Sequence, residues 1–465
     1  FDTTYTINNA LNKYAKLPLT DTTIYSTTQG PIQRHTNTFY YASKLTTATM
    51  AGTYATTVTY TAVGAEIAPV PLRFKQISVG SSHACAIASD NNAYCWGSGY
   101  WGQLGDGTYT HSVATPVSVA KLAGGLEGLT AKQISVGRYH TCVVASDDNA
   151  YCWGSGANGS NHGQLGNGAS LNSNIPVPVA KLAGGLEGLT VKQVSAGDTS
   201  TCAIASDDNV YCWGYGTYGQ LGNGSNSTSD VPVPVAKIAG GLEGLSIKQI
   251  STGGEDTCAI ASDGNLYCWG SGWYGKRGNG SSSTSNIPVS VSKLSGGLAG
   301  LTIKQVSVGN EHICAITSDN NAYCWGGEGT NSGVIGSDIS TSSNIPVPVA
   351  KLTGGLEGLT VKQISAGYSH TCAIASDDNV YCWGYGTYGE LGNGSNSTSD
   401  VPVPVLRLPG GLEGLTVEKI SSEGTTCTIV SSKDVYCWGS GNSGELGNGH
   451  NENSNIPVKV INPTP

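Results

Sequence analysis

Short hydrophobic runs, separated by polar and glycine-rich clusters, follow one another along most of the chain. Typical runs read VKQISAG, TCAIAS, VYCWG and IPVPVAKL. Their enrichment in Val, Ile, Tyr and Trp, and their Gly, Asn, Asp and Ser borders, predict short β-strands joined by turns. The connecting segment AGGLEGLT carries three glycines, so we expect no helix there. The pattern therefore predicts an all-β chain with four strands in each recurring unit.

The strand pattern repeats seven times between residues 65 and 465. The tetrad Tyr-Cys-Trp-Gly appears in every unit, and a second cysteine lies ten residues before its Cys, at intervals of 55 to 60 residues from one unit to the next. Four strands in a unit of this length are typical of a propeller blade. We therefore predict a seven-bladed β-propeller over 65–465, with a glycine-rich solenoid as the alternative.

The two cysteines of each unit face each other if the segment between them is a hairpin. In CAIASDDNVYC (202–212) a three-residue loop ends at Asp208, and other units have Asn, Asp, Gly or Lys there. With such a loop, residue 202 is opposite residue 212, where Cβ atoms are about 4.5–5.5 Å apart. We predict one disulfide per blade, although free buried thiols or a metal site would use the same residues. The predicted pairs are Cys85–Cys95, Cys142–Cys152, Cys202–Cys212, Cys258–Cys268, Cys314–Cys324, Cys372–Cys382 and Cys427–Cys437.

The segment HTCAIASDDNVYCWGYGTYGELGNG (370–394) resembles the repeat signature of the regulator of chromosome condensation family. The resemblance extends over about residues 69–462 and implies a seven-bladed propeller. Members of this family include a nuclear exchange factor for a small GTPase and a secreted bacterial inhibitor of β-lactamase, so the fold transfers but the activity does not. We expect a member of the bacterial secreted or surface type.

Composition narrows the functional classes. Only 12% of the residues are charged and the formal net charge is −9, which argues against a nucleic-acid partner. No apolar run is long enough to span a membrane. The chain begins at Phe1, from which we expect processing or trimming. Seven disulfides predict an oxidising, extracellular or cell-surface location.

Residues 1–64 differ from the repeats. They contain 18 Thr and seven Tyr but no Cys or Trp, and TYATTVTYTAV (53–63) alternates as a half-buried strand does. We predict a small β module that serves attachment or assembly, followed by the propeller. We also expect IAPVPLRF (67–74) or IPVKVI (456–461) to complete a blade begun at the other end of the chain.

Catalytic chemistry finds little support in the repeats. His83, His140, His312 and His370 each precede the first Cys of a unit by two residues, but Ser200, Asp256 and Thr425 replace them elsewhere. We expect all of them to bond the local backbone. Acidic residues recur as copies of one turn, which supplies no pair of unlike environments for a general acid and base. We predict no enzyme activity, no catalytic residue, no metal and no cofactor.

Aromatic residues follow the Tyr-Cys-Trp-Gly tetrad in glycine-rich loops. Tyr and Trp provide large contact area at a small entropic cost, so exposed ones are candidates for a binding surface. The residue immediately before Gly-Gln-Leu-Gly is expected to pack against a neighbouring blade, and the Trp of each tetrad belongs to the core. The candidate binding residues are Tyr100, Trp101, Tyr215, Tyr218, Trp273, Tyr274, Tyr385 and Tyr388.

Three functions follow from these features. The first is an extracellular scaffold, surface adhesin or subunit of a surface polymer, in which residues 1–64 contact a neighbouring copy. The second is a secreted inhibitor or receptor that holds a protein partner with the loops of one propeller face. The third, guanine-nucleotide exchange, is disfavoured because the repeats are too short for a large inserted wedge and disulfides do not suit a nuclear protein. The near-identity of 202–235 and 372–405, which differ only at Gln220 and Glu390, favours a scaffold.

Overall fold

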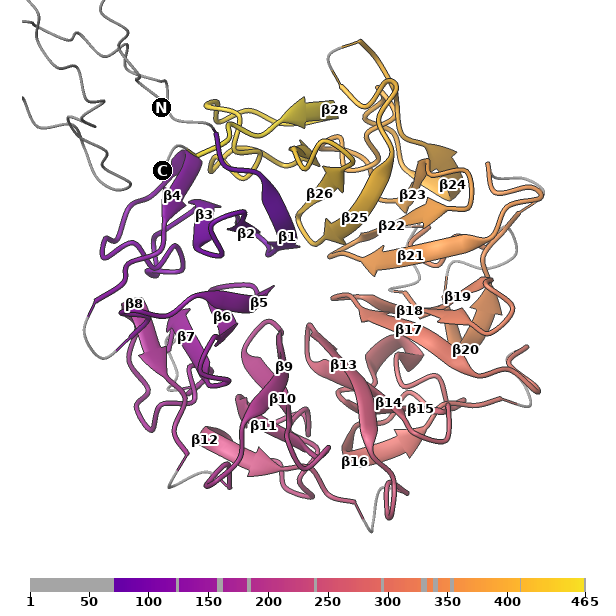
Figure 1. Ribbon diagram of the computed structural model, residues 1–465. Helices are drawn as coiled ribbons and strands as arrows, with labels where there is room; N and C mark the ends of the chain where they lie inside the picture. The colour runs from indigo at the N-terminus through magenta and orange to yellow at the C-terminus, as the bar shows by residue number, and fades with distance from the viewer. Residues whose placement is uncertain are drawn as a thin grey trace, which may run out of the picture. The chain divides into compact units, whose positions relative to one another are not determined.

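The computed structural model describes residues 71–122, 125–156, 162–181, 185–237, 241–293, 297–327, 333–337, 342–351, 355–409 and 411–463. In these residues, 28 strands form seven four-stranded antiparallel sheets arranged around a central axis (Figure 1). The only helix among them is a short 3-10 turn, η2 (Trp273–Gly275). The chain is a seven-bladed propeller, as the repeats predict.

Every blade uses its strands in chain order, from the axis outwards. The first strands are β1 (Phe74–Val79), β5 (Ala131–Val136), β9 (Val191–Ala196), β13 (Ile247–Gly253), β17 (Ile303–Val308), β21 (Val361–Ala366) and β25 (Val417–Ser422). The second strands are β2 (His83–Ala88), β6 (His140–Ala145), β10 (Ser200–Ala205), β14 (Asp256–Ala261), β18 (His312–Thr317), β22 (His370–Ala375) and β26 (Thr425–Val430). The third strands are β3 (Ala93–Gly97), β7 (Ala150–Gly154), β11 (Val210–Gly214), β15 (Leu266–Gly270), β19 (Ala322–Gly326), β23 (Val380–Gly384) and β27 (Val435–Gly439). The fourth strands are β4 (Val113–Ser118), β8 (Ser173–Pro178), β12 (Ser229–Pro234), β16 (Ser285–Ser290), β20 (Ser343–Pro348), β24 (Ser399–Pro404) and β28 (Ser454–Lys459).

The hairpin between the second and third strands brings the two cysteines together. In the third blade Cys202 pairs with Cys212 across β10 and β11, and Asp208 ends the turn with a positive φ of 62°. A disulfide joins this pair and its six equivalents, which leaves no free cysteine among the described residues. One disulfide per blade is therefore confirmed.

The tetrad tryptophan holds neighbouring blades together. Trp153 of the second blade is fully buried, and its Nε1 donates to the carbonyl of Gln103 in the first blade at 2.9 Å. The backbone of Gly105 lies against the indole ring so closely that a Cβ there would be 2.5 Å from Nε1. The same indole hydrogen bond occurs at all seven interfaces. This contact explains why each repeat needs a Trp and, in the loop before the next blade, a glycine.

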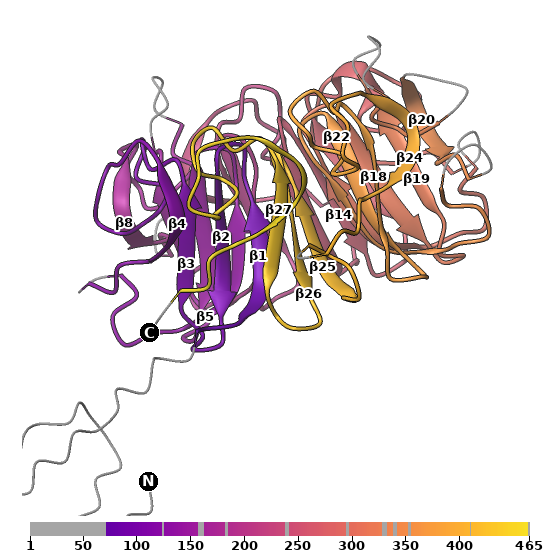
Figure 2. The same ribbon diagram turned by 90° about the horizontal axis from the view of Figure 1, so that it is seen from above.

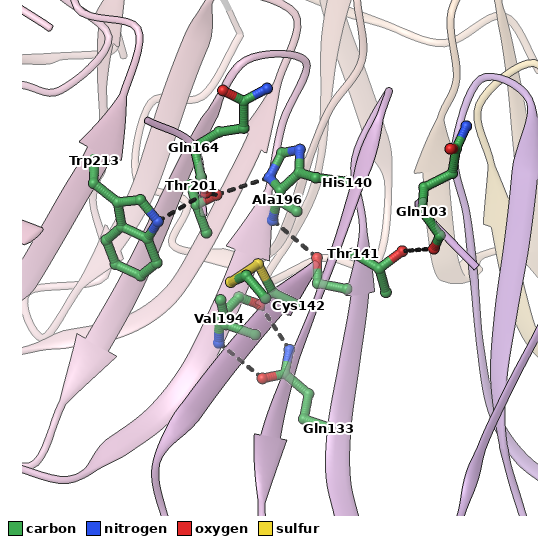
Figure 3. The surroundings of a disulfide bond; sticks show 12 residues. Gln103, Gln133, His140, Thr141, Cys142, Gln164, Val194, Ala196, Thr201 and Trp213 are labelled. Carbon is green, nitrogen blue, oxygen red and sulfur yellow. Dashed lines mark hydrogen bonds between the residues drawn. A yellow bond between two sulfur atoms is a disulfide. The ribbon is translucent and has the colours of Figure 1, made fainter. Parts of the chain in front are cut away.

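Polar side chains of the first strands join the blades around the axis. Ser135 accepts the backbone N–H of Ala196 in the next blade at 2.9 Å, and Gln133 bonds both the N–H and the C=O of Val194 (Figure 3). The serine bond recurs at all seven interfaces. The glutamine bonds recur at six, because Lys419 replaces Gln in the last blade.

The ring closes without a shared strand among the described residues, contrary to the expectation above. IPVKVI overlaps β28, the fourth strand of the last blade's own repeat, and β1 belongs wholly to the first blade. The first strand β1 lies beside β25 and β26 (Figures 1 and 2). The backbone N–H of Leu72 donates to Pro463 and that of Phe74 donates to Lys433, at 3.0 and 2.9 Å. Side-chain packing and these bonds therefore complete the ring.

The Thr- and Tyr-rich segment 1–64 lies outside the described residues. The predicted boundary between residues 64 and 65, and the β module before it, stay predictions.

Candidate functional site

The antiparallel order of each blade places two kinds of loop at the same end of the propeller. The inner loops join first to second strands, and the outer loops join third to fourth strands. We call this end the aromatic face. The hairpin turns between second and third strands and the segments between blades lie at the opposite end, which we call the hairpin face. Figure 2 shows the blades from the side, with the strands running between the two ends.

All eight aromatic residues singled out from the sequence lie on outer loops of the aromatic face. Tyr100, Trp273, Tyr274 and Tyr388 have between 43% and 51% of their surface exposed. The other four, Trp101, Tyr215, Tyr218 and Tyr385, are half-buried. Exposed aromatic side chains thus recur on outer loops of several blades, whereas the seven tetrad tryptophans lie in the core as predicted.

These aromatic rings contact one another in rows that cross from one blade to the next. Trp101 contacts Tyr100 in its own loop and Tyr139 in the next blade, with ring centroids 4.8 and 6.5 Å apart. Tyr218 of the third blade contacts Trp273 of the fourth at 5.3 Å. Trp101 and Tyr218 therefore do pack against a neighbouring blade, as expected for the residue before the Gly-Gln-Leu-Gly motif.

His162, from the second blade, extends the row of aromatic rings that contains Tyr218 and Trp273. Its ring centroid lies 4.6 Å from that of Tyr215. Tyr215 in turn contacts Tyr218 at 5.8 Å. Four aromatic rings from three consecutive blades are thereby linked along the rim of the aromatic face.

The inner loops form the mouth of the central channel on the same face. Arg138, Asp198 and Glu423 line a cavity of about 150 Å³ there, with the ends of the first strands. Arg138 forms an ion pair with Asp198 at 3.2 Å, and its guanidinium lies over the rings of Tyr139 and Tyr368, at 5.1 and 5.7 Å. These residues come from the second, third, sixth and seventh blades. The seven inner loops thus place unlike side chains around one small cavity.

The mouth is electrostatically unusual. Burial and the neighbouring Asp198 carboxylate raise the pKa of Glu423 to about 8, and Arg138 lowers it only in part. Burial also raises the pKa of Asp198, against the opposing effect of Arg138. Burial also raises the pKa of Glu255, and the nearby Asp198 carboxylate adds to this effect. Lys276 also acts on Asp198 and Glu255, but it pairs with Asp256, so the carboxyl groups at the mouth are only partly neutralised.

The four histidines are buried at the interfaces between blades. His140 is fully buried, and its Nε2 lies 2.8 Å from the hydroxyl of Thr201 in the next blade (Figure 3). His83, His312 and His370 make the same contact with Thr141, Thr371 and Thr426. Burial lowers their pKa, to about 3 for the first three and about 4 for His370. For the four histidines the expectation of local backbone bonding was wrong, because the partner is a side chain of the next blade.

Where the next blade lacks this threonine, another residue replaces the histidine. Asp256 precedes a blade with Ile313 at the threonine position, and it instead forms a buried ion pair with Lys276 at 2.7 Å. Thr425 precedes a blade with Ala84 there, and its hydroxyl donates to the carbonyl of Ser440. Ser200 is the exception, since Thr257 follows it. The changes among repeats at this position therefore largely follow the packing between blades.

The four histidines line neither the cavity at the mouth nor a second cavity at the opposite end. The second cavity, about 690 Å³, opens on the hairpin face, and its lining includes Lys304, Lys362 and Lys419. In the part of the chain that the structure describes, no three His, Cys, Asp or Glu are grouped to hold a metal ion.

None of the described helices is long and apolar enough to cross a membrane.

The sequence analysis did not identify the inner loops as part of a site, and it did not name several aromatic residues of the aromatic face. Tyr109 and Tyr368 are exposed on the aromatic face, and Tyr139 is half-buried beside Arg138. A signal was present: the inner-loop residues differ from one repeat to the next, although the strands on either side hardly change. Local strand patterns do not indicate that seven such loops meet at one point.

Two profiles of the Regulator of chromosome condensation (RCC1) repeat match the chain. The first matches residues 74–103, 131–164, 191–220, 247–275, 303–331 and 361–390. The second matches residues 90–144, 207–260, 263–316, 377–429 and 434–464.

Individual proteins show the same similarity. The chain is 30% identical over 397 residues to the ultraviolet-B receptor UVR8 of Arabidopsis thaliana, which covers 85% of this chain and 83% of the receptor. Among solved structures, yeast RCC1 (Prp20), bound to Kap60, aligns with a TM-score of 0.65 and 20% identity, over 85% of this chain and 86% of that one. Human WBSCR16 aligns with a TM-score of 0.63 and 22% identity, over 76% and 85%. The two structural likenesses concern the fold.

Proposed function

Because the chain belongs to the Regulator of chromosome condensation (RCC1) repeat family, we propose that it acts by binding other proteins through its aromatic face and not by catalysis. The observation that carries the proposal is the gathering of exposed Tyr and Trp at one end of a rigid ring. Tyr100, Trp273, Tyr274 and Tyr388 project from outer loops on blades that disulfides and buried tryptophans hold in place. Rigid aromatic anchors are what protein interfaces use most for affinity.

Related proteins support this proposal by what they bind. The yeast protein Prp20p is described with binding properties to Gsp1p and histones, and it has been solved bound to Kap60. Both structures are less than 25% identical to this chain and show a common fold, so they do not identify its partner.

The setting that we propose is extracellular or at the cell surface, where the chain is a scaffold, an adhesin or a subunit of a surface polymer. Seven structural disulfides support an oxidising compartment. Residues 1–64 would attach the propeller to a neighbouring copy, since a Thr- and Tyr-rich segment with few charges has little repulsion against strand pairing.

A second candidate is a secreted inhibitor or receptor that works as a monomer. The same aromatic face supports it, because its outer-loop rings cover several blades and surround a charged mouth. The two candidates differ in whether the chain assembles with itself.

Electron microscopy of the full chain separates these candidates, since a surface polymer forms filaments and an inhibitor gives single particles. Deleting residues 1–64 and comparing assembly states by light scattering then tests the role of that segment. If both forms are monomers, the polymer role is wrong.

Binding through the aromatic face has its own test. The double variant Trp273→Ala/Tyr388→Ala should abolish binding to a purified partner or cell surface. Leu408→Ala is the matched control, because Leu408 is 44% exposed on the hairpin face. Equal loss in both variants, or loss in neither, contradicts the proposed binding face.

A further inference from the structure

We propose that the aromatic face binds a basic polypeptide segment, and that the channel mouth receives one Lys or Arg side chain of it between Asp198, Glu423 and Tyr368. This inference rests on the proposed function and adds the chemistry of the partner. Three features of the described residues carry it: the distribution of charge between the two faces, the guanidinium already held in the mouth, and the divergence of the inner loops.

The charge of the propeller is divided unequally between its faces. Among the described residues, the loops and adjoining strand ends of the aromatic face carry eleven Asp and Glu but three Lys and Arg. All the other described charged residues lie at the hairpin face, where sixteen Lys and Arg balance sixteen Asp and Glu. The excess negative charge therefore belongs to the aromatic face alone.

Burial sharpens this difference. Lys276 and Arg277, two of the three cations of the aromatic face, are about 95% buried, and Asp256, Glu390 and Glu445 are buried as well. Seven carboxyl groups outside the buried set and a single such cation, Arg138, then remain to act on a partner, in addition to the buried Asp198 at the mouth. A surface of this kind attracts basic segments and repels nucleic acid.

Arg138 shows that the mouth accommodates a planar cation. Its guanidinium lies between the rings of Tyr139 and Tyr368 and pairs with Asp198. Such stacking on aromatic rings together with a carboxylate is a favourable environment for Arg and Lys. Asn310 donates to the same carboxylate of Asp198 at 3.4 Å, which fixes its position.

Arg138 and Lys276 do not balance this site, because Lys276 is buried and already pairs with Asp256. Asp198, Glu311 and Glu423 all act electrostatically on Tyr368, and Arg138 is the only cation among the groups that do so. Glu423 lines the cavity of about 150 Å³ together with Asp198 and Arg138, and both of these groups act on it electrostatically. A second cationic side chain would pair with Glu423 in a position that no residue of the described chain fills.

The inner loops are also where near-identical blades diverge. The third and sixth blades share 40 of the 45 residues in 191–235 and 361–405, and three of the five differences are consecutive, at 198–200 and 368–370. Two of these three positions are the inner-loop residues Asp198 and Thr199, replaced by Tyr368 and Ser369. Divergence at the mouth on a preserved scaffold is the pattern expected of residues that select a partner.

Titration of the full chain with decalysine, followed by calorimetry, tests this inference. We expect Asp198→Asn/Glu423→Gln to weaken decalysine binding at least tenfold. The matched control is Glu187→Gln/Glu243→Gln, which makes the same carboxyl-to-carboxamide substitutions on the hairpin face and should alter affinity less than twofold. Thermal melting verifies that both variants fold, and decaglutamate serves as the peptide of opposite charge.

The inference is overturned if decalysine does not bind, if decaglutamate binds more tightly, or if the two double variants weaken binding equally. Its failure is distinguishable from failure of the proposed function. If Trp273→Ala/Tyr388→Ala abolishes partner binding while Asp198→Asn/Glu423→Gln leaves it intact, the protein-binding function holds and the basic chemistry of the partner is wrong.

Discussion

The third and sixth blades are almost the same polypeptide, yet they contribute differently to the molecule. Over 191–235 and 361–405 the four strands have equivalent bounds, and each blade has the same disulfide. The differences are Val194/Ile364, Asp198/Tyr368, Thr199/Ser369, Ser200/His370 and Gln220/Glu390.

Each difference has a distinct position in the structure. Val194 and Ile364 are equivalent core residues, each 1% exposed. Asp198 and Tyr368 meet at the channel mouth, whereas Ser200 and His370 lie at interfaces between blades. Gln220 and Glu390 each accept a backbone N–H two residues earlier in the outer loop. The comparison teaches that packing residues are shared, while divergence concentrates at the mouth and at titratable buried positions.

The largest effect should come from a position that the two blades share. In Gly222→Ala and Gly392→Ala the new Cβ would be 2.6 and 2.7 Å from an indole nitrogen of the next blade, and both glycines have positive φ. We expect each to lower the free energy of unfolding by roughly 3 kcal/mol or more, and equally. Urea denaturation measures this.

Gly224→Ala separates contact from backbone strain. Gly224 also has a positive φ of 84°, but nothing lies within 4 Å of a Cβ there. Its cost should be about 1 kcal/mol. A cost as large as that of Gly222→Ala would mean that strain, and not the blade contact, explains the glycine.

The next effect distinguishes the blades by pH. Burial lowers the pKa of His370 to about 4, below its unfolded value near 6.5, so its contribution to stability is lost as pH falls from 6.5 towards 4. Between pH 7 and pH 5 the unfolding free energy should fall by about 2 kcal/mol more in the wild type than in His370→Ser. In Ser200→Ala the unfolding free energy should fall between pH 7 and pH 5 by the same amount as in the wild type. If its fall is smaller by about 2 kcal/mol, the effect does not come from His370.

A smaller effect concerns the mouth. Tyr368→Leu removes the ring beside Arg138, and we expect decalysine affinity to fall about fivefold, which corresponds to ~1 kcal/mol for a cation–π contact. Tyr368→Phe keeps the ring and should bind as the wild type does. Calorimetric titration measures both variants. If Phe weakens binding as much as Leu, the hydroxyl is the important group and not the ring.

The smallest effect is at the single difference within 202–235 and 372–405. Glu390 is buried, and burial raises its pKa, so the folded state favours the protonated carboxyl and stability is lost as pH rises. Glu390→Gln should therefore raise the unfolding free energy at pH 7 by less than about 1 kcal/mol, with the gain vanishing below pH 4. Gln220→Glu should do the reverse. Chemical denaturation at pH 7 and below pH 4 measures these changes in unfolding free energy. If Glu390→Gln remains more stable at the lower pH, the raised pKa of Glu390 is not the cause of the gain.

Features set by residues close in sequence could be predicted. The turn at Asp208 fixes the pairing of Cys202 with Cys212, because a three-residue loop leaves one register for the hairpin. The core position of Trp213 follows from the same strand. Both arguments need only about ten residues of sequence.

Features that join different blades could not be predicted in this way. His140 and Thr201 are 61 residues apart, and no local pattern indicates that one hydroxyl would replace the backbone as the partner. Arg138 and Tyr368 meet only because the ring brings the second and sixth blades to opposite sides of one narrow channel. The outer-loop aromatics could be named in advance because exposure there depends on a single glycine-rich loop.

The absence of a shared strand in the described ring has a consequence for how such a gene evolves. Each sheet is encoded by one uninterrupted stretch of sequence, from β9 to β12 in the third blade and from β21 to β24 in the sixth. Duplication of one repeat therefore duplicates all four strands of a sheet, and the new sheet needs no strand from another part of the chain. We infer from their near-identity that the third and sixth blades arose by duplication of one repeat, which lets new inner loops arise on a blade that already folds.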